Sequence, residues 1–168
     1  TGINGSIINN GTIKNLSDYG MLAVNNSSAI NEGHIQNTGN IGMAGSSGSS
    51  VENKENGIIE NTGFVGMLAE ENGSTVVNRG LIANGGMYGI WVSQGRGENY
   101  GIVQNNFLSG IVAHDNGRVD NYGFVQNNGN VGMSAQLGGT AVNQISGIIC
   151  HTGNSGMAVA DSQTIPTT

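Results

Sequence analysis

The sequence predicts an all-β protein: a right-handed parallel β-helix (solenoid) of about seven coils, with 21–24 residues and three short strands per coil. The first observation is a Gly-Met or Gly-Ile pair that recurs with this period, at Gly20-Met21, Gly42-Met43, Gly66-Met67, Gly89-Ile90, Gly110-Ile111, Gly132-Met133 and Gly156-Met157. The second is a Gly-x-Ile/Val motif whose apolar residue always lies eight positions earlier, at Ile13, Ile35, Ile59, Ile82, Val103, Val125 and Ile149. One unit repeated at this spacing predicts a solenoid.

Each unit contains three predicted strands. Fixed Gly positions and abundant Asn, Ser, Thr, Val and Ile disfavour helix, and alternation with a period of two is typical of strands. The first strand precedes a recurrent Asn, and we expect one column of its residues to face the interior: Ile7, Ala29, Val51, Val76, Gly97, Val119 and Ala141. The second strand holds the Ile/Val of the second motif. In the third, we expect Tyr19, Met21 and Ala23, with their equivalents in later coils, to share the inward face.

Two columns of Asn support the stacking of coils about 4.8 Å apart. Stacked amides both donate and accept hydrogen bonds, and Asn tolerates the left-handed backbone of tight corners. We therefore expect structural ladders rather than sugar-binding sites. The first column is Asn9, Asn31, Asn53, Asn78, Asn99, Asn121 and Asn143. The second is Asn15, Asn37, Asn61, Asn84, Asn105 and Asn127, with His151 in the seventh place.

Length variation is concentrated after the third strand, in loops 46–50, 70–75, 93–97, 114–118 and 136–140. Variable coil length favours the right-handed form over the left-handed one, whose coils keep a strict length. Two further insertions, Lys54-Glu55 and Gln144-Ile145, add two residues and so preserve strand parity. The two recurrent Gly columns are expected where a corner needs positive φ or close backbone approach.

Length and composition predict one domain over residues 1–168, cut from a longer solenoid, with an irregular tail at 161–168 that contains Pro166. A net charge of −6 with five Lys and Arg disfavours nucleic-acid binding. The sequence has no apolar run long enough to insert this segment into a membrane. The single Cys, Cys150, excludes an internal disulfide framework.

Right-handed β-helices include enzymes that act on acidic polysaccharides, and such sites need converging carboxylates. Here the acids scatter. Glu71, Asp115 and Asp161 share a loop position but lie two coils apart, about 10 Å. Cys150 and His151 are adjacent in a strand and so point to opposite faces. We predict that the chain is not an enzyme and has no catalytic residue, metal ligand or cofactor.

Two columns that should face outward are unusually apolar. The residue before each Ile/Val is Thr12, His34, Ile58, Leu81, Ile102, Phe124 and Ile148 in successive coils. The residue after each Met/Ile is Leu22, Ala44, Leu68, Trp91, Val112, Ser134 and Ala158. Exposed apolar rows mark interaction surfaces. We expect a partner to bind Ile58, Leu81, Ile102, Phe124, Ile148, Leu68, Trp91 and Val112; the alternatives are that a flanking element covers one row or that one column faces inward.

The repeat Asn-x-Gly-x-Ile-x-Asn-x-Gly-x-x-Gly-Met, as in residues 31–43, resembles the passenger-domain repeats of large Gram-negative autotransporter adhesins, most of all the fusobacterial ones. The resemblance spans residues 3–160. It implies display on the bacterial cell surface, outside the outer membrane, and anchoring through a part of the parent protein that this chain lacks. It also implies contact with host or bacterial partners.

The expected function is therefore that of a surface-displayed β-helical adhesin that binds a protein or glycan on host cells or bacteria, with self-association as a further mode. Another expectation is a structural spacer without a ligand of its own. A polysaccharide-processing enzyme is the third and weakest. Exposure of the outward apolar rows distinguishes the first two, because a spacer needs no such surface.

Overall fold

The structure, a computed structural model, describes residues 4–15, 18–37, 39–61, 63–84, 86–126, 129–150 and 152–160. Asn127, His151 and the predicted tail at 161–168 lie outside the described residues. The side chains of Asn15, Asn37, Asn61 and Asn84 also lie outside them, so the second predicted ladder is described only at Asn105, which is exposed and has a φ of 61°.

The described residues form three parallel sheets, each with one strand from every coil. Sheet A contains β1 (Ser6–Asn9), β4 (Ser28–Asn31), β7 (Ser50–Asn53), β10 (Thr75–Asn78), β13 (Arg96–Asn99), β16 (Arg118–Asn121) and β19 (Thr140–Asn143). Sheet B contains β2 (Thr12–Asn15), β5 (His34–Asn37), β8 (Ile58–Asn61), β11 (Leu81–Asn84), β14 (Ile102–Gln104), β17 (Phe124–Gln126) and β20 (Ile148–Cys150). Sheet C contains β3 (Tyr19–Ala23), β6 (Ile41–Gly45), β9 (Val65–Glu70), β12 (Tyr88–Ser93), β15 (Ser109–His114), β18 (Val131–Gln136) and β21 (Ser155–Ala160).

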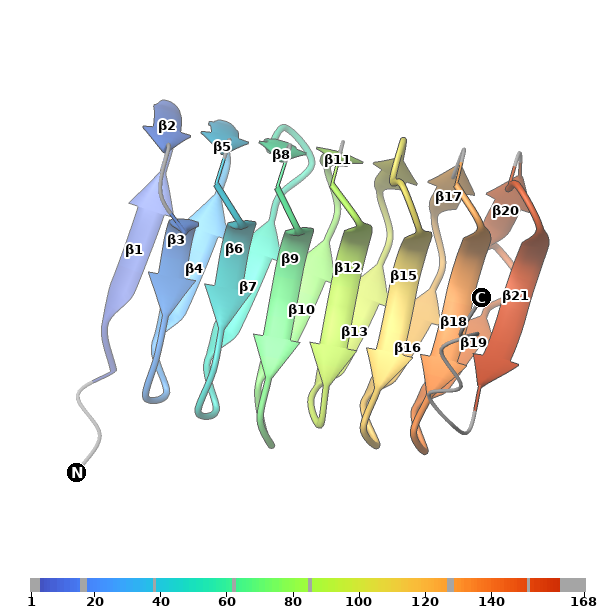
Figure 1. Ribbon diagram of the computed structural model, residues 1–168. Helices are drawn as coiled ribbons and strands as arrows, with labels where there is room; N and C mark the ends of the chain where they lie inside the picture. Colours follow the sequence, from blue (N-terminus) through green and yellow to red (C-terminus); the bar gives the residue numbers. More distant parts are fainter. Residues whose placement is uncertain are drawn as a thin grey trace.

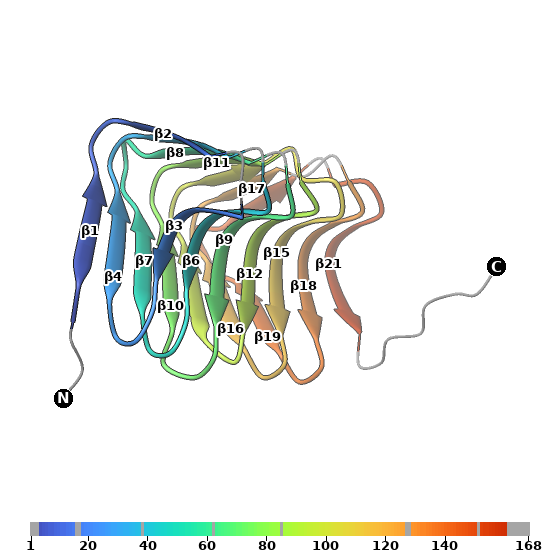
Figure 2. The same cartoon turned by 60° about the vertical axis from the view of Figure 1, so that its left-hand side comes forward.

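The chain winds as a right-handed solenoid (Figures 1 and 2). In Figure 1 it descends through sheet C at the front, returns upward through sheet A at the back, and advances from left to right. Each strand pairs in parallel with its equivalent one coil away, and equivalent residues lie opposite each other, as in Asn78↔Asn99 and Ile90↔Ile111. The predicted fold class is confirmed, with three strands per coil.

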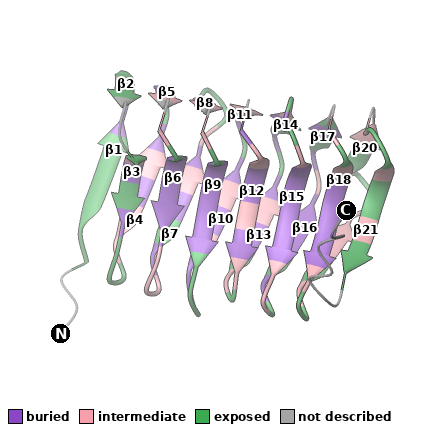
Figure 3. Cartoon of the chain, in the orientation of Figure 1, coloured by how far each residue is buried: buried purple, intermediate pink, exposed green. Residues whose placement is uncertain are grey.

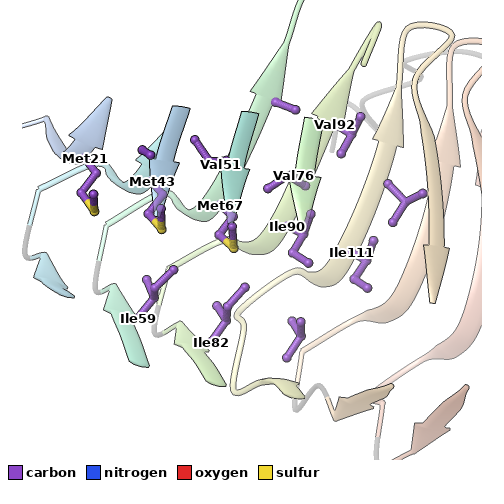
Figure 4. Packing of buried hydrophobic residues seen from close by; sticks show 14 of the residues in the cluster. Met21, Met43, Val51, Ile59, Met67, Val76, Ile82, Ile90, Val92 and Ile111 are labelled. Atoms are coloured by element: carbon purple, nitrogen blue, oxygen red, sulfur yellow. The ribbon is translucent and has the colours of Figure 1, made fainter. Parts of the chain in front are cut away.

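The interior holds three stacked columns of apolar side chains, one from each sheet (Figure 4). Sheet C supplies Met21, Met43, Met67, Ile90 and Ile111; sheet B supplies Ile35, Ile59 and Ile82; sheet A supplies Val51 and Val76. Nearly all are fully buried. Exposed residues gather on the first and last strands, β1 and β21 (Figure 3). The coils thus bury one another's inner faces, as the sequence predicts.

The Gly before each Met or Ile allows the backbone of adjacent coils to approach closely. A Cβ at Gly42 would lie 2.5 Å from Cγ2 of Ile59 and 2.6 Å from the carbonyl oxygen of Gly66. The φ of Gly42 is not positive. Of the two reasons expected for these Gly columns, close approach is therefore the one that holds.

The strands of sheet C depart from simple alternation at this Gly. A Cβ on Gly42 would contact an interior Ile, and Met43 is also in the interior, so two consecutive residues face inward. Ile41 consequently packs outside with Ala44. The expectation that Tyr19 and its equivalents face inward is therefore wrong: Ile41 and Val65 belong to a second, outer apolar cluster.

The first Asn column forms a continuous ladder at the corner between sheets A and B. Each Nδ2 donates to the Oδ1 of the equivalent Asn in the next coil, with N···O distances of 2.7–2.9 Å from Asn9 to Asn143. Each also donates to a nearby carbonyl, such as Asn99 to Gly101. From Asn31 to Asn121 these side chains are fully buried. The structural role predicted for this column is confirmed.

The variable loops after sheet C contain most of the left-handed backbone among the described residues. Asn25, Asn26, Ser47, Glu71, Gln94, Asp115, Asn116 and Leu137 have positive φ there, as do Gly48, Gly73 and Gly138. The two-residue insertions at 54–55 and 144–145 lie between sheets A and B, and Ile145 is fully exposed. Both insertions leave the sheet register unchanged.

Candidate functional site

The predicted row on sheet B faces outward and is accessible. We call Ile58, Leu81, Ile102, Phe124 and Ile148 the sheet B row. They lie opposite one another in successive strands. Ile58 and Leu81 are half-buried, while Ile102, Phe124 and Ile148 are 41%, 49% and 45% exposed. Neighbouring coils therefore present a continuous apolar strip on this face.

The row on sheet C also faces outward, but two of its predicted partner-binding residues are not accessible. Leu68 is 7% exposed and Val112 is fully buried. Leu68 packs in the outer cluster with Ile41, Ala44 and Val65. Val112 lies opposite Trp91 and two residues before His114. The rings of Trp91 and His114 contact each other, with their centroids 5.1 Å apart. Between the exposed Leu22 in the first coil and the half-buried Ala158 in the last, the expected exposed row on sheet C is thus reduced to the half-buried Trp91.

The surroundings of Trp91 form a cleft of about 280 Å³ on the outer face of sheet C, which we call the sheet C cleft. Ile41, Val65 and Leu68, all buried, form its floor. Phe64 and Trp91 line it as well, and Glu70, Ser93 and His114 complete its polar edge. These residues come from coils two to five.

Aromatic contacts hold the cleft together. The ring of Tyr88 meets those of Phe64 and Trp91 edge to face, at centroid distances of 5.3 and 4.6 Å. The rings of Phe64 and Trp91 are 6.1 Å apart and tilted by 36°. Partial burial of the Tyr88 phenol raises its pKa above the ordinary value. Edge-to-face packing of this kind fixes ring orientation and adds to stability.

The sequence contained a signal for this cleft that alternation alone obscures. Phe64, Met87 and Leu108 occupy the corner position that holds Asp18, Asn40, Asn130 and Asn154 in other coils. Asn40 donates to Asp18 and Asn154 donates to Asn130, so the column is polar at its two ends and apolar in the middle. A local change from polar to apolar residues in a surface column indicates a specialised surface. His114, expected in a loop, is the last residue of β15.

A different surface lies on sheet A, where charged side chains form a network. Arg118 donates to both carboxylate oxygens of Asp120, at 2.8 and 2.7 Å, and Gln144 donates at 2.7 Å. Burial alone would raise the pKa of Asp120, but these hydrogen bonds bring its pKa below the ordinary value. Burial likewise raises the pKa of Glu52, but hydrogen bonds and charge interactions with Lys54 and Arg79 bring it below the ordinary value.

This network predicts acid-sensitive stability. Asp120 is 1% exposed, and its pKa is lower in the folded than in the unfolded state. Its ionised carboxylate therefore stabilises the fold fully above pH 3.8, the ordinary pKa. This stabilisation is lost as the pH falls through the pKa of the folded state. We expect Asp120→Asn to cost about 1–2 kcal/mol at neutral pH, because Arg118 is half-exposed and can turn to water. Its stability should then fall less on acidification than that of the wild type. Urea denaturation at several pH values measures this. Glu55→Gln, at an exposed site, is the control; an Asp120→Asn curve parallel to the wild-type curve would contradict the prediction.

The predicted scatter of acidic residues is not complete, because Glu98 and Asp120 lie opposite each other on adjacent strands of sheet A, with Arg96 near both carboxylates. His34 contacts Glu60 at 3.2 Å on sheet B. His114 lies on sheet C, three coils further along the solenoid. Within the described ranges, no group of three His, Cys, Asp or Glu side chains is placed to hold a metal ion. The described part of the chain also has no helix long and apolar enough to cross a membrane.

Comparisons with protein families, with curated proteins and with solved structures find no match to this chain. The fold and its surfaces define the class: a β-solenoid whose outer faces carry an apolar row on sheet B, a charged network on sheet A and an aromatic cleft on sheet C.

Proposed function

We propose that the chain is part of a surface-displayed β-helical adhesin and that it binds a protein or glycan on host cells or other bacteria. The observation that carries this proposal is the exposure of the sheet B row. A spacer needs only its interior and its ladder, whereas three adjacent coils here present Ile102, Phe124 and Ile148 to solvent. Apolar side chains stacked at strand spacing form a surface that another molecule can cover.

The chemistry of the row favours a protein partner over a glycan. Aliphatic side chains and one Phe offer no hydrogen bonds, and apolar and aromatic anchors dominate protein interfaces. Next to the row lies a column that includes Gln36, Glu60, Gln104 and Gln126, which supplies a polar rim. The repeat's resemblance to autotransporter passenger regions supports display outside the cell.

Replacing the row should weaken this binding. We expect a variant with Ile58, Leu81, Ile102 and Phe124 all changed to Ser to lose at least about tenfold in affinity for cells, since truncating even one hot-spot residue of an interface costs about 2 kcal/mol or more. Flow cytometry of labelled protein on host cells and on bacteria measures it, with circular dichroism to verify folding. A variant with Glu70, Asn72 and Thr140 changed to Ser, all exposed and outside sheet B, is the control and should bind as the wild type does.

The outcomes separate the alternatives. Equal binding by the four-Ser variant and the wild type would remove the sheet B row from the proposal. Absence of wild-type binding to every cell type would favour a spacer. Loss of a concentration-dependent dimer in the four-Ser variant, measured by analytical ultracentrifugation, would assign the row to a second copy of the chain. Shortening of acidic polysaccharides on incubation would instead support an enzyme.

A further inference from the structure

We propose that the sheet C cleft binds a trimethylammonium group, an organic cation that carries no N–H. This site shares no residue with the sheet B row and stands independently of the adhesive role proposed for that row. The rings of Phe64 and Trp91 both line it, its floor is aliphatic, and Glu70 lies at its edge. Aromatic faces attract cations through the ring quadrupole, most strongly with Trp.

The electrostatic surroundings favour a cation. Glu70 lines the cleft and the exposed Glu71 follows it in the chain. The five Lys and Arg residues lie elsewhere, in or beside strands of sheets A and B. The chain as a whole has a net charge of −6. A positively charged ligand therefore meets a negative edge and aromatic rings, whereas an anion meets no Lys or Arg there. His114 is the other ionisable side chain that lines the cleft.

The floor selects among cations. Ile41, Val65 and Leu68 present apolar side chains, so an ammonium or guanidinium group placed on them would leave some of its N–H donors unpaired. A donor that loses water without gaining an acceptor lowers the affinity. A trimethylammonium group has no donor to satisfy, and its methyl groups pack on aliphatic carbon. Lysine and arginine side chains are thus disfavoured relative to a quaternary ammonium.

The hollow exists because side-chain size changes along the outer rows of sheet C. Ala44 lies opposite Leu68, which in turn lies opposite Trp91, so the row grows from small to large over three coils. Trp91 borders the floor, and the ring of His114, which also lines the cleft, contacts it at 5.1 Å. The cleft is therefore a fixed feature of packed rings.

Trp91 is the only Trp of the chain, so its fluorescence reports on the cleft directly. We expect tetramethylammonium and choline to change this fluorescence saturably. The uncharged choline isostere 3,3-dimethylbutan-1-ol should bind about 5- to 30-fold more weakly, the factor corresponding to a cation–π contribution of about 1–2 kcal/mol. Equal affinity for the isostere, or an absence of saturable change with either cation, would overturn the proposal.

Variants test the same site by calorimetry with tetramethylammonium. Glu70→Gln should weaken binding about threefold to tenfold, since it removes the nearest negative charge, and Phe64→Leu should weaken it similarly. Glu55→Gln, at an exposed loop position remote from sheet C, is the charge-matched control and should leave binding unchanged. Because Glu70 is exposed, its replacement leaves the fold intact. Unchanged affinity in Glu70→Gln and Phe64→Leu would refute the assignment.

Three further ligands identify the source of the group. Phosphocholine should bind more weakly than choline, because its phosphate lies near Glu70 and Glu71 without a neighbouring cation. Equal or tighter binding of phosphocholine would contradict the electrostatic argument. A peptide with trimethyllysine should bind, and the same peptide with unmodified lysine should not. Binding of both peptides with equal affinity would overturn the selectivity argued from the apolar floor.

Discussion

Gly66→Ala is expected to destabilise the protein by about 3 kcal/mol or more, as overpacking of a rigid interior does. The added Cβ would lie 2.5 Å from Cγ2 of Ile82 and 2.7 Å from the carbonyl oxygen of Gly89. Ile82 is fully buried, and Gly89 belongs to the backbone of β12, which pairs with β9 and β15. Neither atom can withdraw without separating adjacent coils, so the substitution acts on the stacking itself.

Gly156→Ala is the matched control, because Gly156 occupies the equivalent position in β21. There the nearest atom to an added Cβ is Cγ2 of Ile149 at 3.9 Å, an ordinary van der Waals distance. We expect a change within about 0.5 kcal/mol. Urea denaturation followed by circular dichroism measures both. A Gly66→Ala variant as stable as Gly156→Ala would show that the coils can separate locally without cost.

The interior was predictable because it repeats. Each coil packs on its neighbours in the same way, so equivalent positions carry the same kind of residue. Ile59, Ile82 and Val103 occupy one such position, and Asn78 and Asn99 occupy another. Seven copies of one pattern leave little freedom in where strands begin or which side chains face inward. The parallel register and the first Asn ladder followed from this repetition alone.

The sheet C cleft was less accessible to sequence reasoning, for a geometric reason. Strict alternation places Ile41 and Val65 on the same face as Met43, in the interior. The backbone instead turns at Gly42, so that Gly42 and Met43 both face inward and the residue before them is moved outside. One local bend thus changed the face of a whole column and created the floor of the cleft.

Exposure of the outer rows also required the structure. The same apolar alternation gave an accessible strip on sheet B and a mostly covered one on sheet C. On sheet B the neighbouring outward column is polar, with Gln104 and Gln126 opposite each other. On sheet C both outward columns are apolar around Val65 and Leu68, so they cover each other. Burial depends on the lateral neighbour, which a single column does not reveal.

The second large effect is expected at the centre of the Asn ladder. Asn99→Ala should cost about 2–4 kcal/mol, because it removes four hydrogen bonds in a site without exposure to water. Asn99 accepts from Asn78 at 2.8 Å and donates to Asn121 at 2.7 Å. It also donates to the carbonyls of Gly101 and Phe124, at 3.3 and 3.4 Å. Truncation leaves Oδ1 of Asn121 without its donor and leaves the Nδ2 of Asn78 without the acceptor that Asn99 supplies.

Asn130→Ala is the control for the chemistry of an amide ladder. The exposed Asn130 accepts from Asn154 at 3.3 Å, so water can replace the lost contact, and we expect a change within about 0.5 kcal/mol. Thermal and urea denaturation of the two variants compare a buried with an exposed Asn pair in the same chain. If Asn99→Ala were no more destabilising than Asn130→Ala, coil stacking would depend on the apolar columns and the backbone bonds alone. The difference between the two variants is thus the part of the stability that only a buried, continuous ladder supplies.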